Sequence, residues 1–308
     1  MGGRVCGIFV IDTDGSASDN GQVLHMTEFT KLQAMGNDFL VTMVEDVAEA
    51  AEAPSLARRM CSRNFGAGAD GLIVVDRKIK AGTSFSSRIF NADGSEAEIS
   101  GNGTRCVAAY LYYSGLWSGP EIGIATAAGP KRGVLVRRDG PRFDFSFDMG
   151  APEFRSDKIP VALDPALDFV IDQPLDLGTE TVRFTSVSMG NPHCSLFFQD
   201  LGDAVFFRLG PLIENHPSFP NRTNVEFIRP VSDSEIEVRF WERGVGPTLS
   251  SGTGSCAAAV AAILNRKTSR RVTVRTAGGS LAVHWRDDGA VLLTASAVVV
   301  YQGLWLLD

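Results

Sequence analysis

The chain has 308 residues, of which 44% are hydrophobic and 21% are charged, and its formal net charge at pH 7 is -7. This length is enough for two domains of ordinary size, and the composition is that of a globular protein. A negative charge balance without a basic patch argues against nucleic acid and anionic membranes as partners. No apolar run reaches the roughly 20 residues of a membrane-spanning helix. A small metabolite is therefore the expected partner.

The cysteines are scattered, odd in number and without the spacing of a metal site or a disulfide framework. They are Cys6, Cys61, Cys106, Cys194 and Cys256. The N-terminus has only a short apolar stretch, less than a signal peptide needs. The sequence therefore predicts no metal and a reducing, cytoplasmic location.

The first 25 residues differ from the rest of the chain. A short apolar segment, CGIFVID, is followed by small, polar and turn-forming residues up to Met26. We interpret residues 1–25 as an extension outside the core. An edge strand followed by a linker is the alternative.

From Thr27 onward, short alternating or apolar runs bounded by Gly, Asp or Asn predict strands. Helices are predicted in three places, from their apolar period and from proline or glycine near their ends. The strand segments include residues 39–46, 71–76, 85–91, 133–138 and 143–150, and the helices are Pro54–Ser62, Asn102–Tyr113 and Thr253–Leu264. The predicted fold class is α+β, rich in strands.

The order of motifs is repeated in the two halves of the chain. A Gly-Asn pair, Gly36-Asn37 or Gly190-Asn191, is followed at a similar distance by a Ser-Gly-x-Gly segment that opens a helix of small residues. The repeat predicts two pseudo-symmetric lobes, each wrapped around a central helix, with a cleft between them. We assign residues 26–149 to the first lobe and 150–296 to the second, with residues 297–308 returning to the first.

Ser100 and Ser251 each stand where one of these two helices is predicted to begin. A serine there commonly caps the helix by accepting a hydrogen bond from an N–H of the first turn. Two helix starts, one from each half, can also offer their free N–H groups to one anion. The sequence predicts a carboxylate held between them.

Polar residues end several apolar strands, at Asn91, Asn191 with His193, Asn224, and Glu242 with Arg243. For a single asparagine a turn is the simpler interpretation, and Asp93-Gly94 is predicted to form one. Glu242 and Arg243 follow an alternating segment, which favours a strand end that lines a cleft. An ordinary surface ion pair is the alternative.

Six segments resemble, in order, the sequence blocks of the diaminopimelate epimerase family across about residues 27–300. They are KLQAMGNDF, RNFGAGADGL, RIFNADGSEAEISGNGTRC, GNPHC, NRTNVEF and ERGVGPTLSSGTGSCAAAVAAI. The resemblance implies a PLP-independent, cofactor-free isomerase that inverts an α-carbon of a diamino diacid between two facing cysteines. It also implies the family's two-lobed fold and makes a homodimer an expectation.

The resemblance also implies a set of site residues. Substrate contacts fall on Asn37, Asn91, Asn191, Asn224, Glu242 and Arg243, and the carboxylate cradle falls on Gly101-Asn102 and Gly252-Thr253. His193 and Glu242 correspond to residues that assist proton transfer. Arg243 can form a planar two-point pair with a distal carboxylate.

Both positions where the resemblance implies a catalytic cysteine hold serine here, Ser100 and Ser251. A free thiol has a pKa of about 8.5, and a serine hydroxyl is several units less acidic. Removal of an α-proton is therefore expected to be harder for this chain.

Three functions remain open from the sequence. The first is a diaminopimelate epimerase that interconverts the LL- and meso-forms for lysine and peptidoglycan synthesis. The second is a related isomerase or racemase with Glu242 or His193 as its base. In one version Ser100 and His193 form a nucleophile–base pair, for which the sequence shows no third orienting group. The third is a non-catalytic paralogue that binds a diamino acid.

Overall fold

The computed structural model describes residues 27–45, 50–76, 84–97, 100–127 and 129–306. The predicted extension, residues 1–25, lies outside these ranges. Among the described helices, none is both long and apolar enough to cross a membrane.

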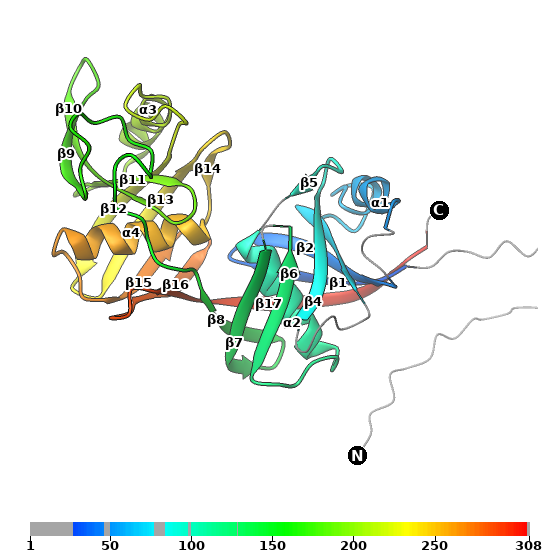
Figure 1. Cartoon of the computed structure of the whole chain (residues 1–308). Coiled ribbons are helices and arrows are strands. Elements are labelled where there is room, and N and C mark those ends of the chain that lie inside the picture. Colours follow the sequence, from blue (N-terminus) through cyan, green and yellow to red (C-terminus); the bar gives the residue numbers. More distant parts are fainter. Residues whose placement is uncertain (1–26, 46–49, 77–83, 98–99, 128, 307–308) are drawn as a thin grey trace, which may run out of the picture.

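The strands of the first half wrap around one helix, α2 (Figure 1), whereas α1 packs in a separate hydrophobic cluster. The elements of this half are β1 (Thr27–Ala34), β2 (Asn37–Val44), α1 (Ala53–Met60), β3 (Gly71–Asp76), β4 (Ser84–Asn91), β5 (Glu96–Ala97), α2 (Gly101–Tyr113), β6 (Glu121–Thr126), β7 (Gly129–Asp139) and β8 (Arg142–Asp148). Strand β9 (Val170–Asp176) follows and pairs with the second half.

The second half repeats this order around α4. Its elements are β10 (Thr181–Ser188), β11 (Pro192–Phe197), α3 (Asp203–Glu214), β12 (Asn224–Ser232), β13 (Glu235–Glu242), β14 (Gly246–Thr248), α4 (Gly252–Leu264), β15 (Arg271–Thr276), β16 (Gly279–Trp285) and β17 (Val291–Trp305). The predicted α+β class and the predicted central helices are confirmed.

Strand pairing shows that the internal repeat is structural. In each half the first two strands are antiparallel, the second and third are parallel, and the third and fourth are antiparallel. The fourth strand of each half then pairs in parallel with the strand after the central helix. Register makes the pair Val41 and Ile73 in the first half equivalent to Ser195 and Glu226 in the second.

Small residues allow both central helices to be enclosed by strands. Nine of the 13 residues of α4 are buried, and most of these are alanine, so the strands can approach the helix closely. Helix α2 is likewise buried over most of its length, against Phe143 and Phe145 of β8. Each helix therefore forms the centre of its own hydrophobic cluster.

Strand β17 joins the two halves. It pairs with β16 of the second half, then with β8, and finally with β1 of the first half, so it crosses the molecule (red in Figure 1). Met149, where the chain leaves β8, packs against both hydrophobic clusters. The lobe boundaries at residues 149/150 and 296/297 remain predictions.

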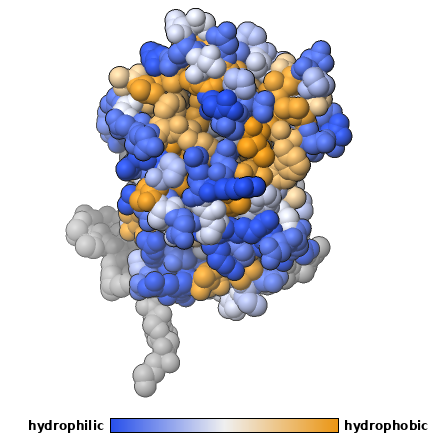
Figure 2. All heavy atoms as spheres, turned by 90° about the vertical axis from the view of Figure 1, so that its left-hand side faces the viewer, coloured by the Kyte–Doolittle hydropathy of each residue, from blue (hydrophilic) through white to orange (hydrophobic). Residues whose placement is uncertain are grey.

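Helix α3 was not predicted from the sequence. Gly210 and Pro211, two residues that normally disfavour a helix interior, lie inside it. Its apolar residues are also on both sides, because Phe206 is buried whereas Phe207 and Leu212 are about half exposed. Figure 2 shows the molecule from the side of the second half, where hydrophobic residues gather in the upper part of the face between hydrophilic ones.

Candidate active site

Ser100 and Ser251 cap the two central helices in the same way. The Ser100 hydroxyl oxygen accepts a hydrogen bond from the Gly103 N–H at 3.0 Å, and that of Ser251 accepts from the Gly254 N–H at 3.3 Å. The capping interpretation is thus confirmed for both serines. The hydroxyl proton of each serine takes no part in this hydrogen bond, so each hydroxyl can still donate a hydrogen bond to another group.

The two glycines of each Ser-Gly-x-Gly segment differ in how much space surrounds them. A Cβ on Gly254 would lie 2.9 Å from Cδ1 of the Phe240 ring, so packing disfavours a side chain there, whereas one on Gly103 would lie 2.9 Å from the terminal methyl group of Ile89, which can move. At Gly101 and Gly252 the nearest atoms would be 4.0 and 3.6 Å away. Packing does not require these two glycines, and the space beside them suits the approach of a ligand to the backbone.

The β1–β2 turn of the first half reaches the segment that precedes Ser251. A Cβ on Gly36 would lie 3.3 Å from Leu249 Cδ1, and Met35 is part of the hydrophobic cluster around α4. Asn37, which follows this turn, therefore lies close to the start of α4. The Arg105 guanidinium of α2 lowers the pKa of the Cys256 thiol of α4, against the larger effect of burial, which raises it.

A chain of side-chain hydrogen bonds connects the start of α2 to Asn37. Arg105, which is 2% exposed, donates to the Asn102 side-chain oxygen, and the Asn102 amide nitrogen lies 3.4 Å from Asn37 Oδ1. Asn37 Nδ2 in turn donates to Asp70 Oδ2 at 2.6 Å. A carboxylate can only accept hydrogen bonds, so the Asn37 side chain turns its amide nitrogen towards Asp70 and its amide oxygen away from Asp70.

Behind Asn37, Asp38 is held in an ionic cluster. Lys31 Nζ lies 2.8 Å from Asp38 Oδ2, and Arg63 Nη2 lies 2.9 Å from Asp38 Oδ1. Burial alone would raise the pKa of Asp38, but the hydrogen bonds from Arg63 and Lys31 lower that pKa to about 2. Asp38 is therefore ionised at neutral pH, where it supports the turn and does not carry a proton.

In the second half, His193 is oriented by a residue that the sequence did not single out. His193 Nδ1 lies 2.6 Å from Glu226 Oε1, and Ser195 donates to Glu226 Oε2 at 3.1 Å. The other ring nitrogen of His193 lies 2.9 Å from Asn191 Oδ1. The expectation that no third group orients His193 was wrong. In the sequence, nothing distinguishes Glu226 from other residues of a strand. It lies beside the His193 ring because of the parallel register of β12 against β11.

Glu242 ends β13 as a partly exposed carboxylate. Its Oε1 accepts a hydrogen bond from the Thr248 hydroxyl at 2.5 Å. Burial raises the pKa of Glu242, whereas the Thr248 hydrogen bond and the charge of His193 lower it, and the net direction is upward. Glu242 lies at the end of β13, as predicted, and no ion pair joins it to Arg243 in the described part of the chain, whereas a cleft beside it remains a prediction.

Asn224 connects the backbone segments around the site. Its side chain donates to the Pro192 carbonyl at 2.9 Å and accepts from the Arg243 N–H at 3.0 Å. The Arg243 guanidinium donates to the Asn221 carbonyl at 3.1 Å and has no carboxylate partner among the described residues. Its charge is therefore open to an anionic ligand, and Asn224 positions its backbone.

Asn91 lies at the exposed end of β4. Its amide nitrogen donates to Ser95 Oγ at 2.9 Å across the turn at Asp93-Gly94, where Gly94 has a φ of 82°. The predicted turn is confirmed. A substrate contact at Asn91 remains a prediction.

None of the four described cysteines can replace the missing thiols. Cys106 and Cys256, each near the start of a central helix, are fully buried, and burial raises the pKa of each thiol to about 12. Burial likewise raises the pKa of Cys61 to about 12 and that of Cys194 well above its ordinary value. Thiolates are the reactive form, so these side chains are structural.

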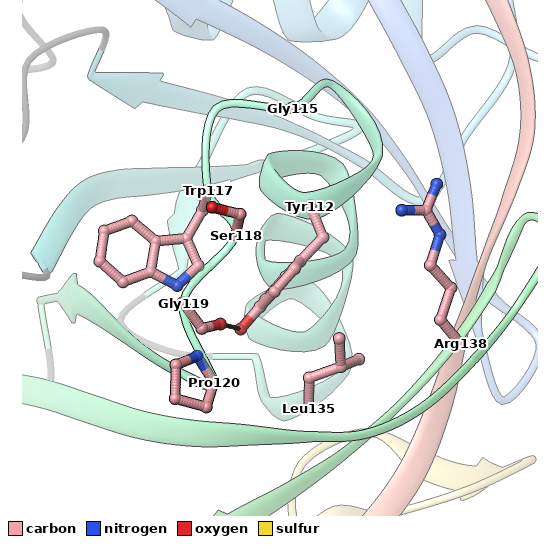
Figure 3. A pocket seen from close by; sticks show the side chains of 8 residues that line it. All are labelled: Tyr112, Gly115, Trp117, Ser118, Gly119, Pro120, Leu135 and Arg138. Atoms are coloured by element: carbon pink, nitrogen blue, oxygen red, sulfur yellow. Dashed lines mark hydrogen bonds between the residues drawn. The ribbon is translucent and has the colours of Figure 1, made fainter.

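A cavity of about 500 Å³ lies in the first half, away from the predicted site (Figure 3). The Tyr112 hydroxyl crosses it to donate to the Gly119 carbonyl at 2.5 Å. Its lining is Tyr112, Gly115, Trp117, Ser118, Gly119, Pro120, Leu135 and Arg138. No residue predicted for the active site is among them, and the predicted cleft between the lobes remains a prediction.

A family model described as diaminopimelate epimerase matches residues 29–155 and 185–301. The chain belongs to the diaminopimelate epimerase family. It is 44% identical to a diaminopimelate epimerase of Moorella thermoacetica, over 91% of this chain and 99% of that protein. It is 45% identical to one of Pelotomaculum thermopropionicum, over 89% and 97% of the two chains. The family predicted from the six motifs is confirmed.

Solved structures with the same fold come from several families. A phenazine biosynthesis protein of the PhzF family from Bacillus anthracis matches with a TM-score of 0.62 and 15% identity, over 92% of this chain and 99% of that one. A hydroxyproline epimerase from Agrobacterium vitis matches with a TM-score of 0.60 and 17% identity, over 92% of each chain. These identities are low, so the likeness concerns the fold alone. The diaminopimelate epimerase-like fold is confirmed.

Proposed function

We propose that the protein interconverts LL- and meso-2,6-diaminopimelate, a step of lysine and peptidoglycan precursor synthesis, by moving the proton on one α-carbon. The observation that carries this proposal is the 44% to 45% identity, along nearly the whole chain, to proteins named for this activity. The two capped helix starts support it, because helix N-termini suit a carboxylate. We expect neither a cofactor nor a metal to take part.

Binding of the diamino diacid uses both halves of the molecule. The carboxylate at the reacting carbon accepts hydrogen bonds from the backbone at Gly101-Asn102 and Gly252-Thr253. Arg243 pairs with the distal carboxylate, for which its guanidinium is open. Asn37 and Asn191 then accept from the distal ammonium, with Asn91 completing this end of the site. A monoamino acid would leave these groups unpaired and bind poorly.

Proton transfer takes place between Ser100 on one face of the α-carbon and Ser251 on the other. One serine takes the α-proton while its own hydroxyl proton passes to a neighbouring base, and the other serine donates its hydroxyl proton to the opposite face. His193 and Glu242 are the bases that exchange protons with the serines. Because hydroxyls are weak acids, we expect slower turnover than a thiol pair would give.

A second candidate reaction uses Glu242 directly. Burial raises the pKa of this carboxyl and so brings it closer to neutrality, which improves a general base. The protein would then be a related PLP-independent isomerase or racemase of another amino acid, in which the serines only cap the helices and bind the carboxylate.

Exchange of the α-proton in deuterium oxide distinguishes these functions. Purified protein is incubated with LL-diaminopimelate, and loss of the α-proton signal is followed by NMR, in parallel with the S100C/S251C double variant. We expect slow exchange by the native protein and exchange at least ~100-fold faster by the variant, the lower end of what an acid–base group contributes.

Other outcomes assign other functions. Exchange only by the double variant, with native binding in calorimetry, indicates a non-catalytic diamino-acid-binding protein. If the S100A/S251A double variant still exchanges the α-proton and the Glu242→Gln variant does not, Glu242 is the base of the reaction. Absence of binding to the native protein would contradict the proposed site.

A cytoplasmic location and a homodimer are part of the proposal. The odd, scattered cysteines fit a reducing compartment. Sedimentation of the full chain measures its oligomeric state directly.

A further inference from the structure

A polar triplet lies inside the second half of the molecule where the first half is apolar. His193 is 0% exposed, Glu226 is 1% and Ser195 is 0%. Strand register makes them equivalent to Phe39, Ile73 and Val41, which are buried in the cluster around α2. The two halves share one topology. Because the first half has this topology with apolar side chains at these three positions, the fold does not require polar side chains there.

Keeping a carboxylate here is therefore costly to the fold. Removal of a charged group from water costs several kcal/mol unless partners compensate for it. Glu226 has such partners in its two hydrogen bonds, yet a well-packed apolar pair is often equally stable or more stable. A role in the chemistry of the site accounts for a buried acid that stability does not require.

The contacts of His193 indicate what that role is. Glu226 Oε1 lies 2.6 Å from Nδ1, and because a carboxylate accepts hydrogen bonds, this contact is satisfied when Nδ1 carries the proton. Only Nε2 is then left to gain or lose a proton. It lies on the far edge of the ring, 2.9 Å from the amide oxygen Oδ1 of Asn191, which accepts from a protonated Nε2; Asn191 is a predicted substrate contact at the β10–β11 turn. Either state of Nε2 can be met by Asn191, because an amide presents an acceptor or, after a flip, a donor.

We propose that Glu226 is a positioning residue of the active site: it fixes the proton on Nδ1 of His193 and makes Nε2 the atom that exchanges protons there. A proton taken up at Nε2 gives an imidazolium, whose charge Glu226 balances, and its release restores the neutral ring with Nδ1 protonated. Other titratable groups near the pair are Glu242 of β13 and Cys194 of β11. The role of His193 in proton transfer rests on the proposed function, but the position of its proton does not.

Nitrogen-15 NMR of the full chain, labelled at its histidines, tests the proton position without any need for turnover. The signal of His193 is identified by its loss in the double variant His193→Phe, Glu226→Ile. That variant copies the apolar pair of the first half and is expected to fold. In the native protein at neutral pH we expect Nδ1 to be protonated. In Glu226→Leu we expect a shift to the form protonated at Nε2, which imidazole prefers in water and which can donate to Asn191. A native ring with a bare Nδ1, or a proton position unchanged in Glu226→Leu, would overturn the proposal.

Kinetics of α-proton exchange provide the second measurement. For Glu226→Gln, which keeps the shape but removes the charge, we expect kcat to fall ~100-fold while KM changes less than ~3-fold, as for loss of a general acid–base group. Glu226→Asp is expected to recover part of the rate. Thr42→Val, which removes a buried hydroxyl hydrogen bond on β2 that does not involve Glu226 or His193, is the control for loss of a buried polar contact and should keep kcat within ~3-fold. Equal losses in Glu226→Gln and Thr42→Val would contradict a positioning role. If the native protein does not exchange, the proposed function fails, and the NMR result still decides the role of Glu226.

Discussion

Asp38 shows how single charged residues support the site from behind. It lies between Lys31 and Arg63, and it follows Asn37, whose amide is fixed by Asp70. Asp70 also accepts from Arg63 and from the Asp38 N–H. These contacts hold the β1–β2 turn in one conformation. Loss of the Asp38 charge should therefore loosen the turn that carries Asn37.

Stability should depend on this charge in acid. The pKa of Asp38 is about 2 in the folded protein, below its ordinary 3.8, so the stabilisation is complete above roughly pH 5 and is lost as pH falls towards 2. We expect Asp38→Asn to lose about 1 to 2 kcal/mol at neutral pH. This is less than the shift alone implies, because Arg63 is 58% exposed and water screens its charge. Urea unfolding at pH 7 and pH 2.5 measures the difference. A gap between native protein and variant that does not narrow in acid would contradict this assignment.

At the scale of the elements, the sequence predicted what local patterns encode. Gly-bounded alternation located β2, β3, β4, β7 and β8, and the Ser-Gly-x-Gly segments located the starts of α2 and α4 to within one residue. Helix α3 was missed because Gly210 and Pro211 interrupt its pattern, although Gly210 is required where the Trp241 ring lies 2.5 Å from a would-be Cβ. Glu226 was missed because its partner His193 is 33 residues away, and only the parallel pairing of β11 with β12 joins them.

The start of α4 offers a test that separates folding from binding. Gly254→Ala would force a Cβ to within 2.9 Å of Phe240, and we expect a loss of about 1 to 3 kcal/mol of stability from overpacking. Gly252→Ala has room, with its nearest neighbour at 3.6 Å, and alanine favours a helix, so stability should be kept. The added methyl group of Gly252→Ala should instead obstruct the carboxylate cradle and weaken diaminopimelate binding ~10-fold or more, a cost of at least about 1.4 kcal/mol. Thermal unfolding and calorimetry on both variants measure the two effects, and full binding by Gly252→Ala would remove this segment from the site.

For the whole molecule, duplication explains how one site can use two halves. Each half places an asparagine after its first turn and a serine at the start of its central helix, so equivalent parts are available from both sides. The halves then diverged where chemistry differs, as His193 and Glu226 differ from Phe39 and Ile73. Besides the pairing of β8 with β17, the two halves meet where the β1–β2 turn lies against Leu249 and Gly278.

Gly278 should therefore control how the two halves meet. A Cβ at this position would lie 2.2 Å from the Met35 carbonyl oxygen and 3.2 Å from Ser250, so Gly278→Ala must push the β1–β2 turn away from the segment before Ser251. Met35 belongs to the hydrophobic cluster around α4, so we expect the overpacking to cost about 1 to 3 kcal/mol of stability in thermal unfolding while the protein still folds. Binding of diaminopimelate should weaken ~10-fold or more, because Asn37 moves relative to the start of α4. Calorimetry compares the variant with Ser280→Ala, an exposed change two residues further on, at the start of β16, that should bind like the native protein. Native affinity in Gly278→Ala would show that the turn of the first half does not contribute to the site.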